Sequence, residues 1–254
     1  MWQAITDKIE QIRAEQGIAI LFCCESGSRG WQFPSPDSDY DVRFIYVRPF
    51  NYYLSVSDLD YDLSFPINDD LDIYGWDIRK VLQLIRKSNT TPFEWLQSPI
   101  VYAQQAGFRD QLWQLCQSYF SQRTNVHHYL GIARGFMEHL NPSNEIGIKK
   151  LFYIIRPVLS AKWCLEKNSI APMTIGPLLD QVPEVLKKTI NQLIRQKATA
   201  DEKSPVTISP HLREYLESEY NRISTDPSLP DKTSFPLEPL DEFFINTLRS
   251  YDSK

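Results

Sequence analysis

The chain has 254 residues, of which 42% are hydrophobic and 13% aromatic, so it can bury a sizeable core and is not a disordered segment. Its formal net charge of −5 argues against a protein that coats duplex DNA, because such binding neutralises many phosphates with lysine and arginine. No apolar run reaches the roughly 18 residues of a membrane span, and the amphipathic N-terminus is unlike a signal peptide. The four cysteines form no CxxC pair and are expected to be reduced, buried thiols. We therefore expect a cytoplasmic protein with no membrane partner.

The N-terminal part of the chain alternates helical and strand patterns. Ile5, Ile9 and Ile12 recur at helical spacing, and Gly17 can cap the helix that they predict. A continuous apolar run then predicts a buried strand, and β-branched and aromatic residues predict two more. The elements expected in chain order are a helix over 4–16, strands over 18–24, 40–47 and 69–76 with a turn at 26–30, and a helix from 77 to 87.

The rest of the chain shows helical periodicity and few strand signals. Pro157 lies inside one of the helical patterns and predicts a kink or a break there. Residues 225–238 are rich in proline, serine and aspartate and predict a loop. The expected helices cover 91–98, 107–121, 125–140, 146–168, 183–197, 209–222 and 239–250. The sequence therefore predicts an α+β protein with two domains, 1–102 with a mixed sheet and helices and 103–254 with helices alone.

Two aspartates separated by one residue begin the strand expected at 40–47. On a strand, alternate side chains point to the same face, so Asp39 and Asp41 are expected to point the same way, with Cα atoms about 6.5–7 Å apart. Two such carboxylates can bind a hard cation such as Mg²⁺. An isolated Asp-x-Asp is common, however, and a simple turn formed by Asp37, Ser38 and Asp39 is then the plainer interpretation.

A glycine-serine pair directly after the first strand favours a functional site over a simple turn. Gly27 permits a close approach of the backbone, and exposed N–H groups after a strand can bind phosphate oxygens. Ser28 adds a hydroxyl donor, and Arg29 can pair with a phosphate. Together with Asp39 and Asp41, this loop favours chemistry on a metal-bound phosphate.

The same residues resemble a known signature. Gly27-Ser28, the ten-residue gap and Asp39-Tyr40-Asp41-Val42 are similar to the motif of the DNA polymerase beta-type nucleotidyltransferases. The longer matching segments resemble the predicted nucleotidyltransferase family assigned to an RNA-repair pathway; they are 25–31, 35–43, 75–80, 88–89 and 94–102. The resemblance extends over about residues 3–250 and is densest in 25–102. It implies an N-terminal polymerase-beta-like catalytic domain followed by an all-helical domain.

The resemblance also implies a third carboxylate on a neighbouring strand, and two positions compete for it. Asp72 lies between Leu71 and Ile73, the usual apolar setting of such a residue. Asp77 opens the next helix, where capping is its alternative role. We favour Asp72 and keep Asp77 as the alternative ligand.

Basic residues of the helical half provide candidate contacts for the triphosphate. Lys150 and Arg156 lie in one predicted helix with Lys149 and Tyr153, so some of these side chains share a face. Related nucleotidyltransferases use a basic helical domain in this way. The resemblance thus adds Lys150 and Arg156 to Gly27, Ser28 and Arg29 as nucleotide-binding candidates, although an exposed or ion-paired helix face is an equal explanation.

The combined prediction is a metal-dependent nucleotidyltransferase. Asp39, Asp41 and Asp72 would hold Mg²⁺ (or Mn²⁺), and a nucleoside triphosphate would donate its monophosphate to an acceptor hydroxyl with release of pyrophosphate. RNA ends are the expected acceptor, with RNA-repair proteins as partners, although an isoelectric point near 5.5 is unusual for a dedicated RNA binder. Two alternatives are nucleotidylation of a protein or small molecule, and a nucleotide-binding partner with little turnover.

Overall fold

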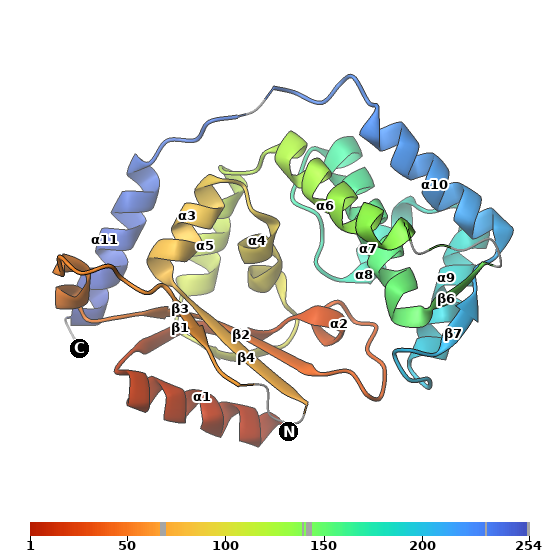
Figure 1. Cartoon of the computed structure of the whole chain (residues 1–254). Coiled ribbons are helices and arrows are strands. Elements are labelled where there is room, and N and C mark those ends of the chain that lie inside the picture. Colours follow the sequence, from red (N-terminus) through yellow and green to blue (C-terminus); the bar gives the residue numbers. More distant parts are fainter. Residues whose placement is uncertain (67–69, 139, 141–143, 232, 253–254) are drawn as a thin grey trace. The chain divides into compact units, whose positions relative to one another are not determined.

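A computed structural model describes residues 1–66, 70–138, 140, 144–231 and 233–252. The chain forms two compact units, each assembled from separate stretches of sequence (Figure 1). The first unit comprises Met1–Gly27, Asp39–Tyr119 and Ser234–Lys254, and the second comprises Ser28–Ser38 and Phe120–Thr233.

The first unit is built on a mixed five-stranded sheet of order β3-β4-β2-β1-β5. The central strand β2 runs antiparallel to β1 and parallel to β4, while β3 and β5 are antiparallel to their neighbours. This arrangement confirms the predicted mixed sheet and adds two short edge strands. The strands are β1 (Ala19–Glu25), β2 (Tyr40–Val47), β3 (Asp62–Ser64), β4 (Leu71–Asp77) and β5 (Val101–Gln104).

Helices cover both faces of this sheet (Figure 1). Helix α1 (Trp2–Gln16) buries its isoleucines in a cluster that includes Val42, Phe44 and Ile73 from the strands. Gly17 ends α1 in the left-handed conformation at φ 59°, as predicted. The opposite face carries the three helices α3 (Ile78–Arg86), α4 (Thr90–Gln97) and α5 (Phe108–Gln117).

The C-terminal helix α11 (Glu238–Asp252) also belongs to the first unit. The ring of Phe244 lies 5.2 Å from that of Tyr53 in the 3₁₀ segment η1 (Phe50–Leu54). The neighbouring Phe243 lies 6.0 Å from Phe108 in α5. These aromatic contacts return the end of the chain to the unit in which it begins.

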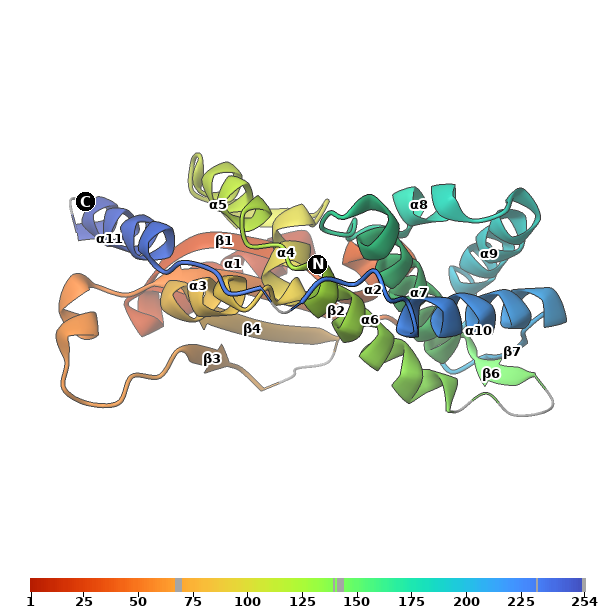
Figure 2. The same cartoon turned by 90° about the horizontal axis from the view of Figure 1, so that it is seen from above.

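The second unit is mainly helical, with α6 and α7 side by side (Figure 2). Helix α7 is buried along most of its length. Of the kink or break predicted at Pro157, the break is absent, because the helix continues through this residue. Strands β6 and β7 form a short antiparallel pair, which was absent from our prediction. The elements are α6 (Gln122–Met137), β6 (Glu145–Gly147), α7 (Ile148–Lys167), α8 (Ile175–Leu178), η2 (Leu179–Gln181), α9 (Glu184–Lys197), β7 (Pro205–Thr207) and α10 (Pro210–Ser224).

The observed division differs from the predicted domains 1–102 and 103–254. Residues 28–38 belong to the second unit because Phe33 stacks on Phe152 of α7, with ring centroids 4.7 Å apart. Lys197 strengthens this attachment, since its buried ammonium donates to Ser35 Oγ at 2.8 Å. A prediction based on contiguous stretches of periodicity could not assign this loop to a core more than one hundred residues away.

All four cysteines are buried, as predicted. In the part of the chain that the structure describes, no helix is both long enough and apolar enough to cross a membrane.

Candidate active site

Two aspartates face each other across the parallel strands β2 and β4. Asp41 of β2 is the register partner of Asp72 of β4. Val42 and Ile73 point into the cluster beneath α1, so the alternation of side chains places Asp41 and Asp72 together on the opposite face. Their side chains are 27% and 31% exposed, which leaves both carboxylates accessible to a ligand.

Arg43, two residues after Asp41, lies between these carboxylates. Its Nη2 donates to Asp41 Oδ1 and to Asp72 Oδ2, each at 2.7 Å. Its Nη1 donates to the backbone oxygens of Asp72 at 2.9 Å and of Val42 at 3.2 Å. The guanidinium therefore compensates two negative charges that would otherwise repel each other. Our sequence reasoning did not select Arg43, although a basic residue at this spacing on the same face was a usable signal.

Asp39 is placed differently from the other two carboxylates. It precedes the first residue of β2, Tyr40, and is exposed. Among the described residues, no group of three or more histidine, cysteine, aspartate or glutamate side chains is close enough to hold a metal ion. The structure thus brings Asp41 and Asp72 together and leaves Asp39 outside a three-carboxylate cluster. Two converging carboxylates still fit Mg²⁺, which commonly takes one or two of them together with substrate phosphates.

Asp77, the alternative third carboxylate, lies at the other end of β4. Its register partner is Tyr46, five positions from the Asp41–Asp72 pair, or roughly 17 Å along the strand. The side chain is fully buried, accepts from the backbone N–H of Arg79 at 2.8 Å as an N-cap, and accepts from the Tyr53 hydroxyl at 2.7 Å. This placement gives Asp77 a capping role in the fold.

The burial of Asp77 leads to a prediction about pH. Burial raises the pKa of Asp77 from 3.8 to about 6, against the opposing effect of its hydrogen bonds from Tyr53 and Arg79. The raised pKa means that the neutral carboxyl stabilises the fold; this stability is complete below about pH 4 and is lost as the pH rises through 6. Asp77→Asn keeps the donors and acceptors of the neutral carboxyl, so the variant is expected to avoid this loss.

The measurement is urea unfolding of wild type and Asp77→Asn at several pH values. The difference in unfolding free energy is expected to move in favour of the variant by up to about 3 kcal/mol between pH 4 and pH 8. A difference that stays constant over this range would show that folding does not raise the pKa of Asp77.

The backbone around Gly27 is fitted to Asp41. Gly27 has φ +56°, and a Cβ at this position would lie 1.9 Å from Asp41 Oδ2. The N–H of Ser26 donates to the backbone oxygen of Asp41 at 2.8 Å. The absence of a side chain at Gly27 therefore allows the Asp41 carboxylate to lie directly against the chain, a purpose that the Gly-Ser pattern had suggested only for phosphate.

A buried glutamate supports Asp41 from the neighbouring strand. Glu25, the last residue of β1, is fully buried and accepts the backbone N–H of Asp41 at 2.7 Å. Its other carboxylate oxygen accepts the hydroxyl of Tyr102 in β5. Sequence reasoning missed this role, although an acidic residue at the end of a wholly apolar strand was the signal that could have revealed it.

The remaining nucleotide-binding candidates belong to the second unit. Ser28 and Arg29 follow Gly27 in the short helix α2 (Gly27–Gly30), where Arg29 Nη2 donates to the backbone oxygen of Ser38 at 2.7 Å. Lys150 is exposed on α7. Arg156 is only 3% exposed, donates from Nε to the Met173 oxygen at 3.1 Å and lies 4.5 Å from the Trp31 ring. These contacts bind Arg156 into the interior of the second unit.

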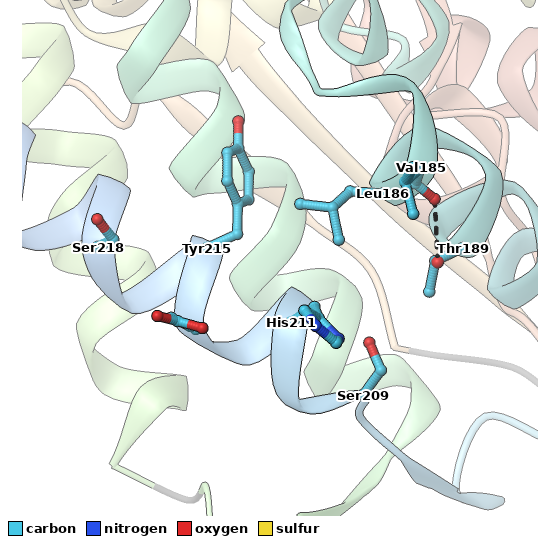
Figure 3. Close-up of a pocket in the computed structure, with 8 residues that line it drawn as sticks. Val185, Leu186, Thr189, Ser209, His211, Tyr215 and Ser218 are labelled. Atoms are coloured by element: carbon cyan, nitrogen blue, oxygen red, sulfur yellow. Dashed lines mark hydrogen bonds between the residues drawn. The ribbon is translucent and has the colours of Figure 1, made fainter.

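The second unit also contains a pocket of about 570 Å³ between α9 and α10 (Figure 3). Leu186 and Tyr215 point toward it, and His211 lies on its α10 side. The described lining residues include none of the predicted site residues, so the pocket is distinct from the carboxylate pair of the first unit.

The first unit thus combines a mixed five-stranded sheet with the Gly-Ser and Asp-x-Asp elements that resemble those of polymerase beta-type nucleotidyltransferases. The model of the family described as the RNA repair pathway DNA polymerase beta family matches residues 1–246, and the chain belongs to this family. The chain is 38% identical over 226 residues to the uncharacterized protein YcgL of Bacillus subtilis strain 168, covering 88% of this chain and 86% of YcgL. A crystal structure of a nucleotidyltransferase-like protein from Exiguobacterium sibiricum 255-15 also matches, with 9% identity, coverage of 96% and 91% of the two chains and a TM-score of 0.31.

Proposed function

We propose that the chain is a metal-dependent nucleotidyltransferase that adds a nucleoside monophosphate to RNA ends. The observation that carries this proposal is the convergence of Asp41 and Asp72 on one cationic nitrogen, because a divalent cation needs the same oxygens at one point. Membership of an RNA repair family supports RNA as the acceptor.

In the proposed reaction, the acceptor oxygen forms a bond to the α-phosphorus, and the bond from that phosphorus to the bridging oxygen breaks. Pyrophosphate leaves with those bonding electrons, and the acceptor proton passes to a base, for which we propose Asp72. A bound Mg²⁺ or Mn²⁺ supplies charge stabilisation for the attacking and leaving oxygens. Asp41 and Asp72 would hold that ion, with Asp39 joining them when the nucleotide is bound.

The chain around Gly27 would orient the triphosphate. We propose that Ser28 and the adjacent backbone N–H groups bind its β- and γ-phosphates, with Arg29 as a further cation. Lys150 remains our proposed contact from α7 because it is exposed. For Arg156, which is buried, we propose support of the loop through Trp31 in place of direct contact with the nucleotide.

The direct test uses NTPs labelled on the α-phosphate, Mg²⁺ or Mn²⁺, and RNA fragments with either a free or a phosphate-blocked 3′ end. We expect label on the RNA with a free hydroxyl and none from NTPs labelled on the γ-phosphate, since the latter label leaves as pyrophosphate. RNA that stays unlabelled in every combination would contradict the proposed acceptor.

Nucleotidylation of a protein or small molecule is the second candidate, favoured by the acidic isoelectric point of about 5.5. The same labelled NTPs incubated with a cell lysate test it, because label would then appear on protein or on a small metabolite. Nucleotide binding without transfer to any of these acceptors would favour a binding partner of low turnover in the repair pathway.

A further inference from the structure

The carboxylates of Asp41 and Asp72 repel each other, and the positive charge of Arg43 offsets this repulsion. Neighbouring strands lie about 4.8 Å apart, and like charges directly opposite each other destabilise a sheet. Asp41 and Asp72 occupy such opposed positions, and one nitrogen of Arg43 bonds to both. The Arg43 side chain is only 16% exposed, so the guanidinium is built into the site and is not a mobile surface cation.

We propose that Arg43 is the resident counter-ion of this carboxylate pair and that a divalent cation binds by displacing it. Arg43 Nη2 lies 2.7 Å from Asp41 Oδ1 and from Asp72 Oδ2. Mg²⁺ would have to approach these oxygens to about 2.0–2.1 Å. A metal ion and the guanidinium would then share the same two oxygens, and their mutual repulsion excludes joint occupancy.

The exchange gives Arg43 a positioning role. In the metal-free protein, its guanidinium holds the two carboxylates toward a common point, aided by its bonds to the backbone oxygens of Val42 and Asp72. The inference depends on the proposed function for the identity of the cation but not on the transfer reaction. Metal binding can therefore be measured without nucleotide or acceptor.

The test is calorimetric titration of Mn²⁺ into wild type, Arg43→Gln and the control Lys80→Gln. Lys80 pairs with Asp62 at the edge of the same sheet, so its variant loses an ion pair without touching Asp41 or Asp72. In wild type, Mn²⁺ has to break the charged hydrogen bonds from Arg43 to Asp41 and Asp72 before it can bind. Arg43→Gln lacks these bonds, so this variant is expected to bind Mn²⁺ about tenfold more tightly than wild type. Lys80→Gln is expected to bind it as wild type does.

Unfolding temperatures provide a second readout on the same proteins. Without metal, Arg43→Gln is expected to unfold at a lower temperature than wild type, because the two carboxylates lose the positive charge that Arg43 places between them. Saturating Mn²⁺ is expected to close that gap, whereas the deficit of Lys80→Gln should persist. Equal or weaker Mn²⁺ binding by Arg43→Gln would overturn the exchange, as would a failure of all three proteins to bind Mn²⁺.

Nitrogen NMR of arginine-labelled wild type tests the exchange without any variant, and so covers the case in which Arg43→Gln does not fold. The side-chain signal of Arg43 should show slow guanidinium rotation in the metal-free protein and fast rotation after saturation with Mg²⁺. A signal unchanged by saturating Mg²⁺ would overturn the exchange. If the Arg43 signal stayed unchanged but wild type still labelled RNA, the exchange would be refuted and the proposed transfer activity would stand. The two proposals can therefore be refuted independently.

Discussion

Asp41→Asn is expected to lower the rate of nucleotidyl transfer by about 10³-fold, equivalent to about 4 kcal/mol of transition-state stabilisation. The substitution preserves the size of the side chain but removes one of the two charges that converge where Arg43 now binds. A neutral amide is a weaker ligand for a divalent cation than a carboxylate, and the proposed reaction uses that cation to stabilise the charge that develops on the phosphate oxygens. The effect should fall mainly on kcat, because the lost interaction is strongest in the transition state.

The matched control is Asp62→Asn, which removes a carboxylate from β3 of the same sheet. Asp62 pairs with Lys80, and its register partner is Trp76. This variant is expected to transfer nucleotide at the wild-type rate, as measured by label incorporated into RNA under initial-rate conditions. Wild-type activity in Asp41→Asn, with folding confirmed by circular dichroism, would remove the carboxylate pair from the mechanism.

Gly27→Ala is expected to damage both stability and activity. An alanine at φ +56° costs about 1–2 kcal/mol, and its Cβ would overlap Asp41 Oδ2 at 1.9 Å, which adds a packing cost. We expect a total loss of about 2–4 kcal/mol of unfolding free energy, measured in urea. The Asp41 carboxylate must move to make room, and a displacement of about 1 Å can lower transfer by about 10²-fold.

The control variant Gly17→Ala separates the cost of the positive φ from the cost of the overlap with Asp41. Gly17 has nearly the same backbone conformation, φ +59°, but among the described residues beyond its two chain neighbours no atom lies within 4 Å of a Cβ built there. This variant is expected to lose only the conformational part, about 1–2 kcal/mol, and to keep full activity. If Gly27→Ala behaved like Gly17→Ala in both measurements, the close approach of Gly27 to Asp41 would have no functional consequence.

Local features of the sequence predicted most elements of the first unit. The strand expected at 40–47 is β2 with the same bounds, and the helix expected after Asp77 begins at Ile78 with Asp77 as its N-cap. The turn expected at 26–30 is instead the short helix α2. The strand expected at 69–76 is β4 (Leu71–Asp77): Asp70 lies in a turn, and residue 69 lies outside the described part of the chain. Short strands such as β3 and β5 were missed because three or four residues carry too little periodicity.

By itself, the sequence determined those helices and strands that depend on neighbouring residues alone. Examples are the apolar periodicity of α1, its cap at Gly17 and the position of Asp41 on a strand. Through the family resemblance the sequence also singled out Asp72 and Asp77 and favoured Asp72. Only the tertiary structure set Asp72 beside Asp41, placed Asp77 at the far end of β4 and brought Arg43 between the carboxylates. The physical reason is that strand register depends on pairing between segments about thirty residues apart, and a local pattern contains no information about that alignment.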